Sequence, residues 1–220
     1  MRICFVTSGG LDAVGEEAGA DIVCFPLSAL GEVSYERELK GETSLFEAVA
    51  MRSKALRCTV VGGCYTDARG IRRKSAVVAE RGRLLGVSDL LNRIDGSAFG
   101  AGAGVKVYET AAGRLGVVVG EDLYFPKVVE TLSLSGADAV LCLFEELSEG
   151  LELTLIRAHA FFYGLPVALC AFGYAAVADS EGRLFFASPA PVGRVTLPKE
   201  REYRLIETRR RLTLRKKREF

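Results

Sequence analysis

The sequence contains no tryptophan and no glutamine, and it has one asparagine, Asn92, and one histidine, His159. A single histidine and no Cys-x-x-Cys pair leave too few ligands at a recognisable spacing for a zinc site. We therefore expect no metal and no cofactor. Depletion of the thermolabile amides, beside abundant Glu and Arg, is typical of proteins from thermophiles, and a biased genome composition produces the same pattern.

Long apolar runs are also absent. No run reaches the about 18 residues that a membrane span needs. The chain starts with a strand-like run, Met1–Thr7, where a signal peptide would have a basic segment and then a long apolar one. We therefore predict a cytoplasmic protein without a membrane partner.

The charge of the chain is balanced overall and uneven along its length. The formal net charge is +1, which gives no global case for nucleic acid. From Lys199 to Phe220, ten Lys/Arg stand against four Glu. We predict one domain over residues 1–200 and a basic C-terminal tail over 201–220. The run Arg209–Arg218 offers phosphate contacts to nucleic acid, but it lacks interleaved aromatics for base stacking, and charge runs are more often solvated tails.

Short runs rich in Val, Ile and Leu alternate with helical segments, which predicts an α/β fold with some antiparallel strands. The predicted strands are Ile3–Thr7, Asp21–Phe25, Cys58–Gly62, Ser75–Ala79, Leu84–Val87, Val105–Glu109, Leu115–Val119, Ala139–Leu143, Pro166–Ala171, Ala175–Asp179, Leu184–Ala187 and Arg194–Leu197. Helices are predicted from a Ser44/Glu47 capping box, from Pro126 to Gly136, and from Leu151 to Tyr163.

The sequence contains a faint internal repeat. Gly19-Ala-Asp-Ile-Val-Cys24 is similar to Gly136-Ala-Asp-Ala-Val-Leu-Cys142. In each copy a glycine and an aspartate precede a strand. The repeat predicts two related halves that each contribute a strand to one core.

The stretch Arg114–Pro126 is typical of a buried strand that ends in a tight turn at Gly120, followed by a helix. Together with Gly19–Pro26, Lys74–Val78, Gly82–Val87 and Arg157–Ala168, it resembles the ordered blocks of the nitrilase, or carbon–nitrogen hydrolase, superfamily. The resemblance covers nearly the whole chain, to about residue 200. It implies a nitrilase-like four-layer α-β-β-α sandwich.

The resemblance also implies a catalytic triad, and this sequence departs from it at every position. The superfamily uses a glutamate as base, a lysine that stabilises the charged intermediate, and a cysteine nucleophile. By position these fall at Leu27, near Leu90, and at Gly120. Loss of the whole set is expected of a fold kept for another purpose. We expect the two leucines to make the former charged pocket apolar, since isolated buried charges are costly.

Some polar residues remain near these positions. Asp95, Glu121, Asp122 and Cys64 are the candidates for a remnant pocket. Asp122 has a structural interpretation, which we favour, as a cap for the helix that starts near Pro126. Cys64 would need a base or cation to become reactive. His159 lies in an apolar helix and is expected to pack or bond a backbone carbonyl.

These observations predict a catalytically inactive nitrilase-like protein, or pseudoenzyme, with a binding, scaffolding or regulatory role and with an unknown small ligand or protein partner. The first alternative is a hydrolase of C–N bonds other than peptide bonds, acting through relocated residues. The second is a nucleic-acid-associated protein that uses the basic tail. The resemblance implies a homodimer or higher oligomer, joined through the helices near 126–135 and 151–163.

Overall fold

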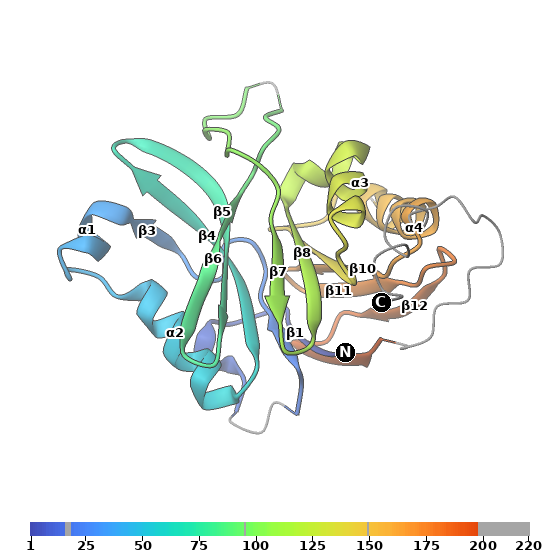
Figure 1. The fold of residues 1–220 in the computed structure, drawn as a ribbon, viewed down its shortest axis with the longest axis horizontal. Helices are drawn as coiled ribbons and strands as arrows, with labels where there is room; N and C mark the ends of the chain where they lie inside the picture. Colours follow the sequence, from blue (N-terminus) through green and yellow to red (C-terminus); the bar gives the residue numbers. More distant parts are fainter. Residues whose placement is uncertain (16–18, 95, 149, 198–220) are drawn as a thin grey trace, which may run out of the picture.

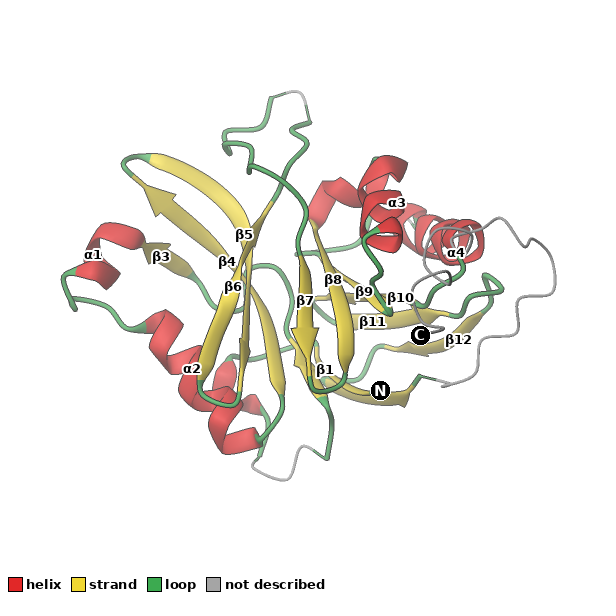
Figure 2. Ribbon diagram, in the orientation of Figure 1, coloured by secondary structure: helices red, strands yellow, loops and turns green. Residues whose placement is uncertain are grey.

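The computed structural model describes residues 1–15, 19–94, 96–148 and 150–197, so Asp95 and the basic tail lie outside the described residues. Thirteen strands form two mixed sheets in this part of the chain (Figure 2). They are β1 (Arg2–Val6), β2 (Ile22–Cys24), β3 (Glu32–Ser34), β4 (Thr59–Ala68), β5 (Ile71–Glu80), β6 (Arg83–Asp89), β7 (Val107–Thr110), β8 (Gly113–Val119), β9 (Ala139–Leu143), β10 (Val167–Ala171), β11 (Tyr174–Ala178), β12 (Leu184–Ser188) and β13 (Val192–Thr196).

Each sheet has a parallel centre with antiparallel strands beside it. The first sheet runs β13-β1-β2-β4-β5-β6, with β3 paired to β4, and the second runs β12-β11-β10-β9-β8-β7. The parallel centres are β1-β2-β4 and β8-β9-β10. The predicted antiparallel strands are present, among them the pairs β5/β6 and β11/β12.

Helices cover the outer face of each sheet, so the layers run α-β-β-α (Figure 1). Helix α2 (Leu45–Leu56) packs on the first sheet, beside the short α1 (Tyr35–Leu39). Helices α3 (Pro126–Leu134) and α4 (Leu151–Tyr163) pack on the second sheet. Three hydrophobic clusters fill the spaces between the four layers. The predicted four-layer sandwich is therefore the observed architecture.

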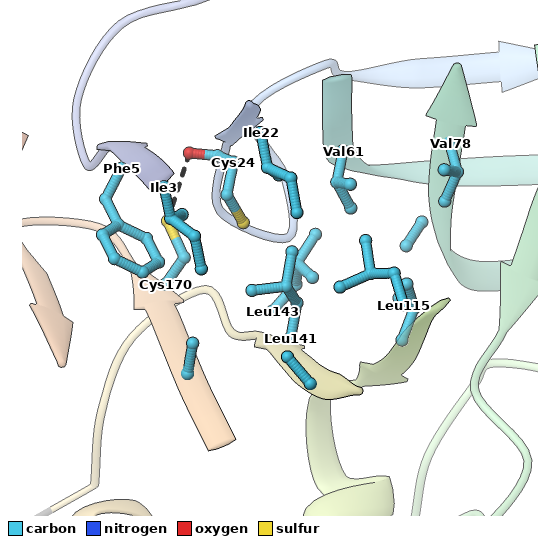
Figure 3. Packing of buried hydrophobic residues seen from close by; sticks show 14 of the residues in the cluster. Ile3, Phe5, Ile22, Cys24, Val61, Val78, Leu115, Leu141, Leu143 and Cys170 are labelled. Atoms are coloured by element: carbon cyan, nitrogen blue, oxygen red, sulfur yellow. Dashed lines mark hydrogen bonds between the residues drawn. The ribbon is translucent and has the colours of Figure 1, made fainter. Parts of the chain in front are cut away.

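The central cluster joins the two sheets through strand side chains that point inward (Figure 3). Cys24 of β2 and Cys170 of β10 meet here, and the Cys170 thiol donates to the Cys24 carbonyl at 3.6 Å. All six cysteines are buried and unpaired, as expected of small hydrophobes. No helix among the described residues is long and apolar enough to cross a membrane.

The internal repeat has a structural counterpart. Asp21 precedes β2, the middle strand of one parallel centre, and accepts a hydrogen bond from the Arg2 amide at 2.7 Å. Asp138 precedes β9, the middle strand of the other, and accepts one from the Arg114 amide at 2.9 Å. Each aspartate thus holds the first residues of the neighbouring strand in register, which accounts for the similarity of the two segments.

Several local predictions are wrong in detail. Strands β4 and β5 extend well beyond Cys58–Gly62 and Ser75–Ala79, and β3 and α1 were not predicted. The Ser44/Glu47 capping box does not form, because Ser44 makes no side-chain cap. In place of Ser44, the carboxylate of Glu38 accepts hydrogen bonds from the free backbone amides of Leu45 and Phe46. A longer-range carboxylate therefore satisfies the amides at the start of α2.

Candidate functional site

A cavity of about 520 Å³ lies where strands of both parallel centres end. Residues that directly follow β8, β9 and β10 line it, together with the segment that follows β2. The lining consists of Leu27, Ser28, Lys74, Gly120, Glu121, Tyr124, Phe144, Glu145, Glu146, Ser148, Glu152 and Phe172. The carboxyl ends of parallel strands are the usual place for ligand sites in α/β folds.

Gly120 makes the tight turn out of β8 as the first residue of the short 3-10 helix Gly120–Tyr124, at a φ of 50°. This is the left-handed region, which favours glycine. A Cβ built on Gly120 would lie 3.6 Å from Leu27 Cδ2 and 4.0 Å from Lys74 Cδ, which is ordinary contact. The turn therefore has room for a side chain between Leu27 and Lys74, and it presents none.

The two leucines that the resemblance places in the triad are both buried. Leu27 is 1% exposed and Leu90 2%, and both belong to the cluster between the sheets. The Leu27 amide donates to the Phe144 carbonyl of the other sheet at 2.9 Å. Gly63 packs against this segment so closely that a Cβ would lie 2.1 Å from the Leu27 backbone. The leucine at position 27 is thus built into the contact between the sheets.

The expectation of an apolar pocket is wrong, because a lysine reaches the cavity from the strand next to Leu90. The Leu90 amide donates to the Lys74 carbonyl, and the Lys74 side chain forms an ion pair with Glu121, with Nζ 2.6 Å from Oε1. The two side chains are 13% and 26% exposed. Lys74 also lies 5.6 Å from the ring of Phe99. The other oxygen of Glu121, Oε2, is buried and has no hydrogen-bond partner among the described residues.

A second carboxylate of the cavity is held by hydroxyl groups. Glu152, at 1% exposure, accepts hydrogen bonds from the Tyr124 and Ser148 hydroxyls, both at 2.6 Å, and from the Ser148 amide at 3.1 Å. Burial on its own raises the pKa of Glu152, but these hydrogen bonds outweigh it and the net pKa is lowered. Glu152 therefore stays ionised and is a weak base for Ser148.

Two further glutamates, Glu145 and Glu146, complete the lining. Burial raises the pKa of Glu145, and the neighbouring charge of Glu146 raises it further. Four carboxylates thus face one ammonium group among the described residues that line the cavity. The side chains that line the cavity therefore carry a net negative charge, and three aromatic residues, Tyr124, Phe144 and Phe172, also line it.

The remaining sequence candidates lie apart from this cavity. Cys64 is fully buried and is not among the lining residues, and burial raises the pKa of its thiol to about 12, with a further contribution from Asp89. A thiol in this state is a poor nucleophile. Asp95 lies outside the described residues. Of the remnant-pocket candidates that the structure describes, Glu121 alone lines the cavity.

Asp122 does not cap the helix that starts at Pro126, since that helix has no side-chain cap. Its two oxygens accept hydrogen bonds from the Leu91 and Asn92 amides and from the Asn92 side chain, all at 2.8 Å. Asp122 therefore ties the turn after β8 to the segment after β6. Burial raises its pKa, although these three hydrogen bonds act in the other direction.

His159 has the role expected of it. The ring is 2% exposed and its Nε2 lies 2.9 Å from the Leu123 carbonyl. The carbonyl can only accept, so Nε2 carries the proton. Burial lowers the pKa of His159, with an opposing contribution from Leu123. The only histidine of the chain is thus engaged away from the cavity lining.

Neither known family models nor curated proteins give a match to this sequence. Solved structures of the same fold do match. An amidase from Nesterenkonia sp. AN1 superposes with a TM-score of 0.74 at 19% identity, over 90% of this chain and 93% of the amidase. A carbon–nitrogen hydrolase from Helicobacter pylori G27 superposes with a TM-score of 0.70 at 18% identity, over 86% of this chain and 85% of the hydrolase. Nit3 of Saccharomyces cerevisiae, a member of the nitrilase superfamily, superposes with a TM-score of 0.71 at 16% identity, over 86% of this chain and 85% of Nit3.

Proposed function

We propose that this chain, which has the fold of the carbon–nitrogen hydrolases, is a non-hydrolytic member of their superfamily that binds a small ligand in the cavity beside Gly120. The observation that carries the proposal is the turn at Gly120, which borders a cavity of about 520 Å³ and has no nucleophilic side chain. Pockets of 300–1,000 Å³ are typical of small-ligand sites.

The cavity lining differs from the active site of the Nesterenkonia amidase in having no cysteine. Variants of that enzyme carry acrylamide, or the acetamide moiety of fluoroacetamide, on an active-site cysteine. In this chain all six cysteines are buried, and none lines the cavity. A thiol mechanism would need a residue that the cavity does not offer.

An ammonia-release assay tests this proposal. Purified protein is incubated with a panel of primary amides and nitriles, and a thiol-directed probe is applied in parallel. We expect no turnover and no fast thiol labelling. Turnover that disappears in a Lys74→Met variant would overturn the proposal.

The alternative is a hydrolase with relocated residues, and Lys74 is the observation that favours it. Its ammonium group lies beside Glu121 in the cavity, next to the turn where a nucleophile would stand. Ser148 is the hydroxyl candidate, but its partner Glu152 has a lowered pKa and is a weak base. An activated serine usually has a histidine or lysine as base, so the geometry favours binding over hydrolysis.

We also propose that two copies associate through α3 and α4. Three large apolar side chains on these helices are half-exposed or more: Leu134 at 53%, Leu151 at 50% and Phe162 at 61%. Light scattering should give a mass of twice the 23.7 kDa chain for the native protein, and the mass of a single chain for Phe162→Asp. Leu39→Asp, at an 88% exposed site at the end of α1, is the control, because α1 lies on the opposite side of the view from α3 and α4 (Figure 1). A monomeric native protein would contradict this proposal.

A further inference from the structure

Four strands end the two sheets in the described part of the chain, and three of them carry charged side chains. Strand β6 begins at Arg83 and ends at Asp89, β7 carries Glu109, and β13 carries Arg194. Charged side chains on an edge strand oppose pairing with a further strand. Strand β12, which lies beyond β11 at the end of the second sheet (Figure 2), has the sequence Leu-Phe-Phe-Ala-Ser and carries no charge.

The β12 edge is also apolar and exposed. Leu184 is 37% exposed and Phe185 40%, and Ala187 is exposed as well. Phe186 packs on the cluster between the sheets, where its ring stacks on Phe5 with centres 5.8 Å apart. The outward N–H and C=O groups of an edge strand have no partner within the sheet. Such an edge accepts an added strand, whose backbone supplies hydrogen bonds and whose side chains cover the apolar surface.

The basic tail, outside the described residues, has the pattern of such a strand. In 211–215, Arg-Leu-Thr-Leu-Arg, leucines alternate with polar residues, which predicts a strand with one apolar face. The chain has a net charge of +1, and 199–220 hold ten Lys/Arg against four Glu, an excess of six. Residues 1–198 therefore carry a net charge of −5, which is complementary to the charge of the tail.

The described chain ends close to β12. Its last residue, Leu197, follows β13 and donates its amide to the Met1 carbonyl at 2.8 Å. Within β13, Gly193 packs so closely on β12 that a Cβ would lie 2.9 Å from the Phe186 ring. The residues from 198 to 210 can span up to about 45 Å when extended, which exceeds the about 10 Å between packed sheets. The segment 211–215 therefore reaches β12 of its own chain.

We propose that residues 211–215 pair with the free edge of β12 in the same chain and extend the second sheet by one strand. Leu212 and Leu214 cover the apolar surface of β12. Arg211 and Arg215 supply the charge that the sequence of β12 lacks. This inference gives the basic tail a docking site in the fold, and it does not depend on the proposed ligand binding.

Hydrogen exchange of the full-length protein, followed by mass spectrometry on peptides that contain β12, tests this pairing. Thr213→Pro removes a backbone N–H in the middle of the added strand and should speed exchange in 184–188 about tenfold or more. Thr208→Pro, the same substitution outside 211–215, is the control and should leave the rate unchanged. Equal rates in the native chain and in Thr213→Pro, or an equal increase in Thr208→Pro, would overturn the inference.

Cross-linking separates the chain's own tail from the tail of a second copy. A variant with Ala187→Cys and Thr213→Cys is treated with a bis-maleimide, while the six native cysteines stay protected by burial. We expect a product with the mass of one chain, in which the peptides that contain positions 187 and 213 are joined. A product of two chains joined through these positions, or no joined peptides, would overturn the proposed pairing within one chain.

Discussion

Replacing Gly120 with cysteine tests both the geometry of the turn and the chemistry of the cavity. The residue adopts a φ of 50°, so any side chain adds the cost of the left-handed region, about 1–2 kcal/mol. No steric term is added, because the nearest atom to a Cβ is Leu27 Cδ2 at 3.6 Å. We therefore expect Gly120→Cys to fold and to lower the melting temperature by about 2–4 °C per kcal/mol.

The variant should gain one thiol that reacts fast with an aromatic disulfide reagent, since the native cysteines are all buried. It should not hydrolyse amides. Leu27 cannot accept the thiol proton, and the Lys74 ammonium is held by Glu121. Gly31→Ala, with a φ of 74° and nothing near its Cβ, is the control for backbone strain alone. A fall in melting temperature much larger than in that control would refute the open space at the Gly120 Cβ. Amide turnover would refute the interpretation that Leu27 leaves the thiol without a base.

Two further predictions concern buried polar groups. Burial holds the pKa of His159 below its ordinary value, so the unfolded chain binds the proton more readily than the folded one. The contribution of His159 to the free energy of unfolding should therefore be complete above about pH 6.5. Below that pH the free energy of unfolding should fall by at most about 1.4 kcal/mol per pH unit. Chemical denaturation across this range should show the slope, and His159→Gln should flatten it; an unchanged slope would exclude His159 as its source. Asp122→Ala should destabilise the fold by about 2–3 kcal/mol, because three donors lose their acceptor. A change below 0.5 kcal/mol, roughly that of a surface site, would contradict the tie between β8 and the segment after β6.

The α/β class and the turn at Gly120 could be predicted because their signals are local, whereas the four-layer order of the sandwich was implied by the resemblance to the nitrilase superfamily. The apolar run before Gly120, the proline at the start of α3 and the repeated Gly-Ala-Asp segments each act over a few residues. The repeat predicted a strand in each half, and the structure shows that the aspartate before each of these strands accepts a hydrogen bond from an amide of the neighbouring strand.

The cavity chemistry could not be predicted because it depends on pairing between distant segments. Lys74 reaches Glu121 only because β5 places it beside Leu90, and no local pattern in the sequence places this lysine near Leu90 or Glu121. Likewise, Glu38 and Asp122 accept hydrogen bonds from amides that lie far along the chain or in another segment, where short-range capping rules do not apply. A correct register for β5 and β6 would have been the signal for Lys74.

The cavity beside Gly120 is proposed to serve no cysteine-dependent hydrolysis. Ammonia release by the purified native chain, measured with primary amides and nitriles against the Glu121→Gln and Lys74→Met variants, tests this most directly. We predict that all three proteins give the rate of the buffer alone. Release by the native chain that either substitution abolishes would contradict the claim.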